Sequence, residues 1–454
     1  MRANFSIILT AIFSWFILHA CMSQEQQEEV LQNSEPQSLD VTVNVGGDSR
    51  AERFLGTFDQ ISRLSLDIDR NYGNKRVLTD FPLEHDGAKW TGTINKLIVG
   101  FDYTITGHAY KCTDCPDQPN IPDYDNYSVS TLAGQAGVRG STNSQGALAK
   151  FDEPHGVAVD SLGNLYIADS ANHLIRKIDY TGNVTTLAGQ AGVSGSSNGL
   201  GNTASFNKPN DIVIDSFGNT YVADTYNHLI RKIDSEGNVI TLAGNGSPGS
   251  SDGQDTAASF NYPASIAIDV SNQIYIADEH NHLIRRIDSS GNVSTIAGSG
   301  SEGSSDGQGT NASFNYPFGI AIDNFGNIFV ADRNNQLIRK VNSSGYVTTV
   351  AGQVGEVGSA NGQGISASFN YPCDVAIDSS GNIYVADNAN HQIRKIDSSG
   401  NVSTIGGQVG IAGSTNGQGT DAKFNKPVGV AVDSSGNVYV ADSASHIIRK
   451  LKGI

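Results

Sequence analysis

The residues best suited to chemistry recur in a fixed order along the chain. Asp169 is followed by His173 and then by Arg176, and a carboxylate, an imidazole and a guanidinium at this spacing could serve acid–base catalysis. A group that returns in every unit of an array, however, solves the same turn and packing problem in each unit. We therefore interpret the set as structural, with the aspartate capping a turn and the arginine paired with a carboxylate. The aspartate recurs as Asp169, Asp224, Asp278, Asp332, Asp387 and Asp442.

Binding residues are better sought where the units differ. Each unit has a proline, and the two residues that follow it vary between polar and apolar types. If those residues begin the innermost strand of each unit, they face the mouth of a central channel. They could hold a divalent metal or another ligand, and a solvated mouth without any ligand is the simpler alternative. The candidate ligand-binding residues at this mouth are His155, Asn210, Asp211, Phe318, Cys373 and Asp374.

An internal repeat sets the elements that must position these residues. Its phenylalanines are spaced by 54 or 55 residues. They are Phe151, Phe206, Phe260, Phe314, Phe369 and Phe424. The first unit has four short strand-like runs, at residues 157–159, 165–167, 173–178 and 184–189, with Gly and Asn at the turns between them. Such a unit is a four-stranded antiparallel meander, and radial repetition of meanders builds a propeller.

The two ends of the array indicate how the ring closes. The run Val-Ser-Thr-Leu-Ala-Gly at residues 129–134 has the pattern of the fourth strand of a unit but precedes the first phenylalanine. The last unit lacks that strand. We expect the earlier run to complete the last unit, which covers its open edge. The prediction is an all-β protein, a six-bladed β-propeller of four-stranded antiparallel blades over residues 127–454, preceded by a small β-sandwich.

The repeat core, at residues 156–160 and 166–177, resembles the NHL repeat family over about residues 127–454. This resemblance implies a six-bladed β-propeller. One departure is Asn335-Gln336, where the other units have Asn-His or Ser-His. The family includes a lyase acting on peptidyl hydroxyglycine and is distantly similar to metal-dependent lactonases. The sites of those enzymes rely on converging acidic, His or Asn ligands, and in this chain only the scattered channel-mouth residues could correspond to them. Some NHL propellers bind RNA on a basic face, whereas this chain interleaves Arg-Lys pairs with aspartate.

Composition excludes several classes of protein. The chain has 454 residues, 51 of them glycine, and only 17% are charged, which argues against a helical bundle. A hydrophobic fraction of 38% is too high for a disordered chain. The formal net charge is −17, and nucleic acids are bound through Lys and Arg, so nucleic acid is not an expected partner.

Two acidic loops invite a calcium hypothesis. They contain Asp252-Gly253-Gln254 and Asp306-Gly307-Gln308. Neither fits the EF-hand or the nonapeptide repeat, and other units have Asn-Gly at this place. Ordinary turn chemistry therefore explains these loops more simply.

The N-terminus has the pattern of an export signal. Residues 1–20 combine Arg2 with an apolar run at 7–18 that is too short to cross a bilayer. Leu18-His19-Ala20-Cys21 resembles the lipobox of bacterial lipoproteins, in which the cysteine is acylated, and an ordinary signal peptide cut nearby is the alternative. Residues 21–38 are a polar tether. We expect an exported protein of the cell envelope, held as an outer-membrane or surface lipoprotein.

Residues 39–118 form the predicted sandwich. Period-two alternation at 39–45 and 64–68 indicates strands, and residues 97–106 resemble the strand-entry segment of fibronectin-type or immunoglobulin-like domains. Cys112 and Cys115 form a Cys-x-x-Cys pair that could be a redox motif, half a zinc site or a disulfide. An oxidising compartment favours the disulfide.

The predicted function is that of a lipid-anchored, non-catalytic binding or scaffold protein that presents a propeller face to a protein or glycan partner. The alternative is a metal-dependent hydrolase or lyase with its site at the channel mouth. We expect no cofactor under the first hypothesis and a channel-mouth divalent metal under the second. Under both, the lipid anchor alone meets the membrane.

Overall fold

The computed structural model describes residues 127–453 in full and, before them, the backbone of seven strands between residues 3 and 111. The chain divides into two compact units, residues 1–121 and 122–454. No helix among the described residues is long and apolar enough to span a membrane. Cys21, Cys112 and Cys115 lie outside the described residues, so the acylation and the disulfide stay predictions.

The first unit contains two antiparallel sheets. One has the strand order β1-β7-β3-β4 and the other β2-β6-β5. Of the two runs that alternate with period two, residues 39–44 lie in β2 and residues 64–68 lie in β3, while the sandwich arrangement remains a prediction. Strand β1 lies within the segment predicted to be a signal peptide, whose removal also stays a prediction. The strands are β1 (Ala3–Leu9), β2 (Gln37–Asn44), β3 (Ile61–Arg70), β4 (Lys75–Pro82), β5 (Glu84–Asp86), β6 (Lys89–Leu97) and β7 (Tyr103–Lys111).

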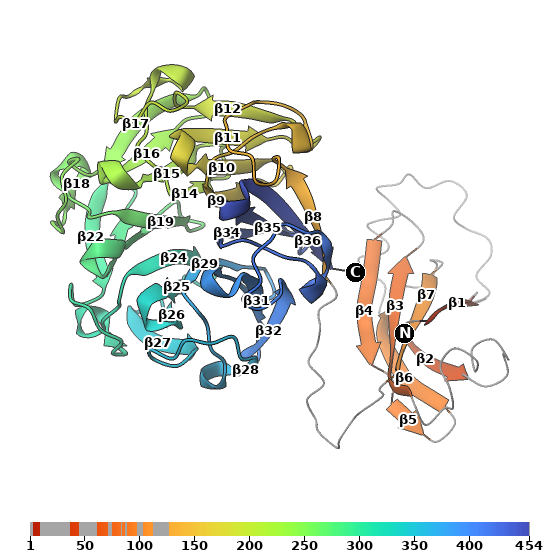
Figure 1. Ribbon diagram of the computed structural model, residues 1–454. Helices are drawn as coiled ribbons and strands as arrows, with labels where there is room; N and C mark the ends of the chain where they lie inside the picture. The colour runs from red at the N-terminus through yellow and green to blue at the C-terminus, as the bar shows by residue number, and fades with distance from the viewer. Residues whose placement is uncertain are drawn as a thin grey trace, which may run out of the picture. The chain divides into compact units, whose positions relative to one another are not determined.

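The second unit is a six-bladed β-propeller (Figure 1), as predicted. Its inner strands, which begin at or just after the prolines, are β9 (Pro154–Val159), β14 (Asp211–Ile214), β19 (Pro263–Ile268), β24 (Pro317–Ile322), β29 (Pro372–Ile377) and β34 (Pro427–Val432). The second strands are β10 (Leu165–Asp169), β15 (Thr220–Asp224), β20 (Ile274–Asp278), β25 (Ile328–Asp332), β30 (Ile383–Asp387) and β35 (Val438–Asp442). The third strands are β11 (Leu174–Ile178), β16 (Leu229–Ile233), β21 (Leu283–Ile287), β26 (Leu337–Val341), β31 (Gln392–Ile396) and β36 (Ile447–Gly453).

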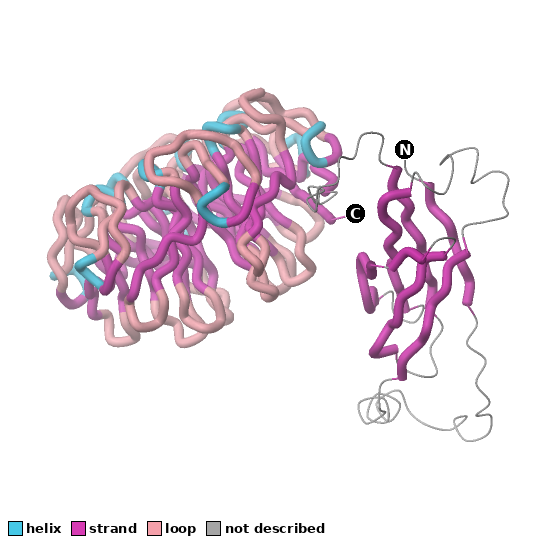
Figure 2. Tube along the Cα trace, turned by 90° about the horizontal axis from the view of Figure 1, so that it is seen from below, coloured by secondary structure: helices cyan, strands magenta, loops and turns pink. Residues whose placement is uncertain are grey.

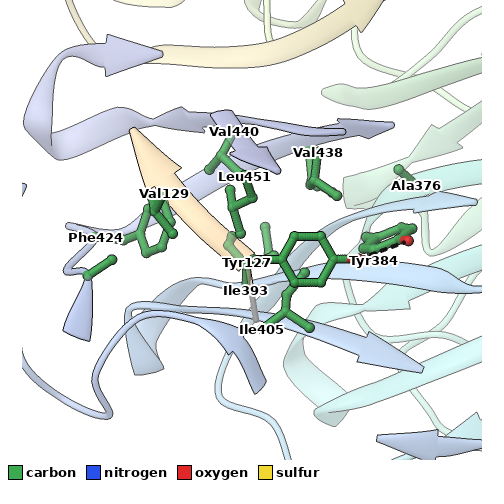
Figure 3. Packing of buried hydrophobic residues seen from close by; sticks show 13 residues of the cluster. Tyr127, Val129, Ala376, Tyr384, Ile393, Ile405, Phe424, Val438, Val440 and Leu451 are labelled. Atoms are coloured by element: carbon green, nitrogen blue, oxygen red, sulfur yellow. Dashed lines mark hydrogen bonds between the residues drawn. The ribbon is translucent and has the colours of Figure 1, made fainter. Parts of the chain in front are cut away.

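The outer strands show how the ring closes. They are β12 (Val184–Ala188), β17 (Asn238–Ala243), β22 (Asn292–Ala297), β27 (Tyr346–Ala351), β32 (Asn401–Gly406) and, for the sixth blade, β8 (Tyr127–Ala133). Strand β8 pairs antiparallel with β36, with Tyr127 opposite Gly453 and Val129 opposite Leu451. The predicted closure by the N-terminal run is therefore confirmed. Figure 3 shows Val129 beside Phe424 and Leu451 in the buried cluster at this junction.

Five blades have one strand more than predicted. The Gly-rich segment before each repeated phenylalanine adds a two-residue strand to the outer edge of its blade, as where Gly253 pairs with Val293. These edge strands are β13 (Gly199–Leu200), β18 (Gly253–Gln254), β23 (Gly307–Gln308), β28 (Gly362–Gln363) and β33 (Gly417–Gln418). In the first blade, Gln145 makes a single bridge to Asn183 at the same place. These Gly-rich segments between the blades thus cover the sheet edges.

Two faces result from this topology. The second and third strands of each blade are joined by a short 3-10 turn, and these turns define what we name the 3-10 face. The opposite ends carry the hairpin turns between first and second and between third and fourth strands, which we name the hairpin face (Figure 2). The turns of the 3-10 face are η3 (Ser170–Asn172), η5 (Thr225–Asn227), η7 (Glu279–Asn281), η9 (Arg333–Asn335), η11 (Asn388–Asn390) and η13 (Ser443–Ser445).

A second set of 3-10 turns lies between blades, each just before a repeated phenylalanine. They are η2 (Gly146–Leu148), η4 (Gly201–Thr203), η6 (Asp255–Ala257), η8 (Gly309–Asn311), η10 (Gly364–Ser366) and η12 (Gly419–Asp421). The phenylalanines themselves have no exposed surface and lie in clusters shared by two neighbouring blades. In one such cluster, Tyr166 of the first blade meets Phe206 and Val222 of the second. The core therefore holds the blades to one another.

Candidate functional site

The repeated aspartate and arginine form a buried ion pair in every blade. In the first, Arg176 Nη1 lies 2.7 Å from Asp169 Oδ2, and neither side chain has exposed surface. The guanidinium also donates to the carbonyl oxygens of Lys150 and Thr142 and to Asn143 Oδ1. Because the group ties two strands to the preceding interblade segment, it has the structural role expected from its repetition.

The prediction that Asp169 caps its own turn is wrong. Asp169 Oδ1 accepts the backbone N–H of Asp152 at 2.8 Å, 17 residues earlier, and does not bond the backbone of its own turn η3. Asn172 of that turn donates its side-chain amide to Asp169 Oδ2. Burial raises the pKa of Asp169 to about 6, against the opposing effect of the Arg176 charge. The carboxylate thus fixes the chain entering the first strand, because the N–H of Asp152 has to be satisfied there.

The histidine of the set joins neighbouring blades. His173 takes the left-handed conformation at the end of η3, and its Nδ1 accepts the backbone N–H of Lys208 in the next blade at 3.0 Å. The histidines of four other blades make the same bond to the next blade. In the fourth blade, Gln336 stands in place of the histidine, and its Oε1 accepts the Tyr371 N–H at 2.7 Å. Burial lowers the pKa of His173, so the neutral acceptor form is favoured.

A small central pocket of about 10 Å³, room for roughly one water molecule, lies where the six inner strands converge. Five of the six predicted channel-mouth residues line it, namely His155, Asn210, Asp211, Phe318 and Asp374. Cys373 does not line it: the thiol is buried, and burial raises its pKa to about 12, so it is protonated and unreactive.

Side chains at the pocket bond first to the neighbouring inner strands. Asp211 Oδ2 accepts from Ser265 Oγ at 2.5 Å and from the Ile266 N–H at 3.0 Å. Asp374 Oδ2 accepts from the Val430 N–H at 2.8 Å. Gly156 is required beside Asp211, because a Cβ there would lie 2.5 Å from Asp211 Oδ1. These aspartates therefore hold inner strands together, whatever else they do.

The same residues limit metal binding. His155 Nδ1 lies 2.6 Å from Asn210 Oδ1, and Asn210 Nδ2 donates to the carbonyl oxygen of Ala264. Burial raises the pKa of Asp211 to about 6, and burial together with the charge of Asp211 raises the pKa of Asp374 well above its usual range. Within residues 127–453 no group of three or more His, Cys, Asp or Glu side chains is arranged to hold a metal ion.

The acidic loops considered for calcium serve the buried arginines instead. Asp252 Oδ1 accepts from Arg285 Nη2 at 2.8 Å, and Asp306 Oδ1 accepts from Arg339 Nη2 at 2.7 Å. Asn143 takes this place in the first blade. An Asp or an Asn therefore accepts equally well from the arginine Nη2, which explains why either residue occurs at this position.

An aromatic strip on the 3-10 face was not predicted from the sequence. We define it as Tyr226, Tyr262, His280 and Tyr316, whose neighbouring ring centroids lie 4.5–5.1 Å apart across the second, third and fourth blades. Tyr226 and His280 are exposed. Lys208 Nζ lies 5.0 Å from the centre of the Tyr226 ring. The strip is a continuous row of rings with polar edges, which is the chemistry of a binding surface.

The strip occupies repeat positions that do not require aromatic residues. The residue before each proline, always left-handed, is Glu153, Lys208, Tyr262, Tyr316, Tyr371 or Lys426. The middle residue of each turn on the 3-10 face is Ala171, Tyr226, His280, Asn334, Ala389 or Ala444. The predictions compared only the residues after the prolines, so this signal was missed although it was present in the sequence.

An ion pair flanks the central pocket on the strip's side of the ring. Arg333 Nη2 lies 2.5 Å from Glu279 Oε1, which links the turns η7 and η9 of the third and fourth blades. The same guanidinium lies over the ring of Phe318, 4.4 Å from its centre. Burial raises the pKa of Glu279, and the Arg333 charge opposes this shift. Phe318, a pocket residue, is therefore held by a group that spans two blades of the strip.

The sequence profile of the NHL repeat matches residues 151–178, 260–287, 369–396 and 424–451. Each match covers the three inner strands of one blade. Four of the blades are NHL repeats. The prediction of this repeat family is confirmed for those blades, and the second and fourth blades share their strand pattern and buried ion pair.

Known proteins are similar to these NHL blades over much of the chain. NHL repeat-containing protein 2 of Bos taurus is 31% identical over 337 residues, which cover 66% of this chain and 46% of the relative. The chain spans less than half the length of the curated relatives it matches.

Two crystal structures share the fold. One, described as a structural genomics protein of unknown function from Bacteroides thetaiotaomicron, has a TM-score of 0.59 at 18% identity over 92% of this chain and 98% of its own. An auxiliary nutrient binding protein from Bacteroides ovatus has a TM-score of 0.56 at 15% identity, over 86% of this chain and 90% of its own. At such identities the likeness shows the fold alone.

Proposed function

We propose that the chain is an exported, lipid-anchored, non-catalytic binding protein, whose propeller recognises a protein or glycan through the aromatic strip beside the central pocket. The observation that carries the proposal is the strip itself, because only in these neighbouring blades do aromatic residues at the two variable positions form one row. Tyr262 and Tyr316 also pack edge-on against the repeat histidines His228 and His282, which fixes their rings in place. Tyrosines with exposed edges supply large contact area at a small loss of side-chain entropy. The printed name of the Bacteroides ovatus neighbour, a nutrient binding protein, agrees with a binding role.

A binding experiment tests the strip with substitutions taken from the other blades. Tyr262→Lys copies Lys208 and Lys426, and His280→Ala copies Ala171, Ala389 and Ala444, so the double variant should fold. The purified protein is screened against immobilised glycans and envelope proteins, and the ligand found is titrated. We expect the double variant to bind at least tenfold more weakly.

The control is Tyr371→Lys, at the same pre-proline position in the fifth blade, where Tyr371 is exposed and outside the strip. Its affinity should match that of the wild type. Equal affinity of the double variant and the wild type, with matched melting temperatures, would show that the ligand binds elsewhere.

The lipid anchor has its own test. Labelling with a radioactive fatty acid in a bacterial host should mark the wild type, and Cys21→Ala should lose the label. Label that persists in the variant would refute acylation at Cys21 but would leave the strip proposal unaffected.

A metal-dependent hydrolase or lyase is the second candidate, favoured by the convergence of His155, Asn210 and Asp374 on one pocket. Elemental analysis of the purified protein, with and without a chelator, tests it. A stoichiometric ion that is lost in His155→Ala would support this candidate. A protein without such an ion, before and after incubation with zinc, manganese or calcium, would exclude it.

A further inference from the structure

The hairpin face carries a second unusual set of side chains. Six large hydrophobic residues within 127–453 are more than 70% exposed, and five of them lie on hairpin turns. Their exposures run from 72% to 84%. We name these five the apolar tips: Leu162, Tyr180, Phe217, Val270 and Phe325. Single exposed hydrophobic residues are ordinary, and what distinguishes these five is that all of them lie on turns of one face.

The turns do not need apolar residues. The N–H of Phe217 donates to Asp215 Oδ1 at 2.9 Å, and the N–H of Phe325 donates to Asp323 Oδ1 at 2.9 Å. Ser380 and Ser435 make the same 2.9 Å bond in the fifth and sixth blades. Serine therefore forms this turn equally well, and the phenylalanine rings project from backbone that is already fixed.

The apolar tips form an arc rather than a ring. They occupy the first four blades, one on each inner hairpin turn, with Tyr180 added on the outer hairpin turn of the first blade. Strand β8 begins at the same face, because Tyr127 pairs with Gly453 at the end of β36 away from the 3-10 turn. The first described residue of the propeller and the apolar tips therefore share one face.

The charges around the tips are mixed, with an acidic excess. In the first three blades, each pair of hairpin turns carries two aspartates, while the end of the third strand carries one cation. In the first blade these are Asp160, Asp179 and Lys177, and Asp160 is bonded to the backbone and side-chain amides of Asn164. This face would be repelled by a strongly anionic surface and not by a neutral one.

We propose that the hairpin face rests on a lipid bilayer of neutral headgroups, with the apolar tips inserted at the interface. Separate apolar side chains on fixed turns fit a fluid phase that closes around each of them, whereas a protein partner would require a continuous complementary patch. Tyrosine favours the depth of the membrane interface, and phenylalanine and leucine bury their apolar surface there. The assignment departs from the sequence prediction that only the lipid anchor meets the membrane, and it leaves the 3-10 face free for a ligand.

Vesicle flotation tests this with the chain from Met22 onward, which lacks both the leader and Cys21. The probe is phosphatidylcholine vesicles, and the variant is Phe217→Ser with Phe325→Ser, which copies Ser380 and Ser435. We expect wild type to float with the vesicles and the variant to partition at least tenfold less. Replacing a third of the lipid by phosphatidylglycerol should weaken wild-type binding at low salt.

The control is Leu148→Ser, since Leu148 is 71% exposed but lies on η2, away from the hairpin turns. It should partition like the wild type. Failure of the wild type to bind phosphatidylcholine, or equal binding by the double variant, would overturn the proposal. So would concentration-dependent self-association without lipid that the double variant abolishes, because the tips would then cover one another.

Discussion

The buried Asp–Arg pair shows why one residue type can be repeated six times without being catalytic. Arg231 Nη1 lies 2.9 Å from Asp224 Oδ2, both without exposed surface, and its other donors reach the carbonyl oxygens of Ser197 and Ser205 and the side chain of Asn198. Removing a charge from water is costly, so the guanidinium needs the carboxylate and the oxygen acceptors that its two terminal nitrogens reach, although its buried Nε has no hydrogen-bond partner. The same set of acceptors meets the arginine in every blade, which is a structural requirement of the repeat.

Replacing the aspartate should therefore destabilise the fold. Asp224→Ala leaves the Arg231 guanidinium buried without its carboxylate, and we expect the free energy of unfolding to fall by about 3–5 kcal/mol. Urea denaturation, followed by the far-ultraviolet circular dichroism of the strands, measures this free energy. An unchanged midpoint, together with loss of ligand binding, would instead assign the residue to a functional site.

Among the elements, the 3-10 turns connect the blades through their terminal histidines. His391 Nδ1 accepts the Lys426 N–H at 3.0 Å, and this bond exists only while the imidazole nitrogen is unprotonated. Burial, and then the charge of Lys426, lower the pKa of His391 below its ordinary 6.5. The left-handed turn residue, which looks in the sequence like part of a catalytic set, is thus an acceptor between elements.

Stability should depend on pH through these histidines. As the pH falls through about 6.5, the unfolded chain takes up protons before the folded one, so the free energy of unfolding decreases. The stabilisation is complete above that pH and is lost toward the lower folded pKa. His391→Gln, which copies Gln336, should reduce the loss of stability between pH 7.5 and pH 6, measured by urea denaturation.

The reverse substitution is the matched control. Gln336→His should increase the same loss, because it adds a sixth titrating acceptor to the ring. The buried aspartates, whose raised pKa values lie near 6, act with the opposite sign as the pH rises from about 4 to 6. They are common to all three proteins and cancel in the comparison. Identical pH profiles would refute the histidine contribution.

At the scale of the whole molecule, ring closure depends on seven residues from the other end of the propeller. Strand β8 alternates between buried and exposed side chains over Tyr127–Ser130, and Val129 is 2% exposed beside Leu451. The hydroxyl groups of Tyr127 and Tyr384 lie 3.5 Å apart, which connects this strand to the fifth blade (Figure 3). The first and last strands of the propeller are therefore one structural unit.

A buried charge in β8 should open the ring. Val129→Asp places a carboxylate in the cluster with Phe424 and Leu451. We expect the free energy of unfolding to fall by several kcal/mol, because the charge is buried without a partner. Hydrogen exchange should show lost protection in β8 and β36 before the other blades. Ser130→Asp, on the exposed side of the same strand, should retain protection. Equal exchange in both variants would show that closure does not depend on this packing.

Most of the propeller architecture could be predicted from the internal repeat of the sequence. The 54- or 55-residue spacing, the turn residues and the early copy of the fourth strand predicted six blades and their closure, because each blade meets the same local requirements. The edge strands such as Gly253–Gln254 were missed, since two residues leave no period to detect. Cys373 does not line the pocket although His155 and Phe318 at the same repeat position do, because a shared repeat position does not fix which side chain reaches the axis.

Sequence alone determined the blade number, the strand order within a blade and the structural nature of the Asp–Arg pair. Tertiary structure alone decided which variable positions meet. Tyr262 and Tyr316 are 54 residues apart in the chain, and they join one strip only through His280 and the packing of neighbouring blades. The apolar tips share a face for the same reason. Closure of the ring brings equivalent turns of successive blades to the same side of the propeller, so residues that are far apart in the chain contribute to one surface.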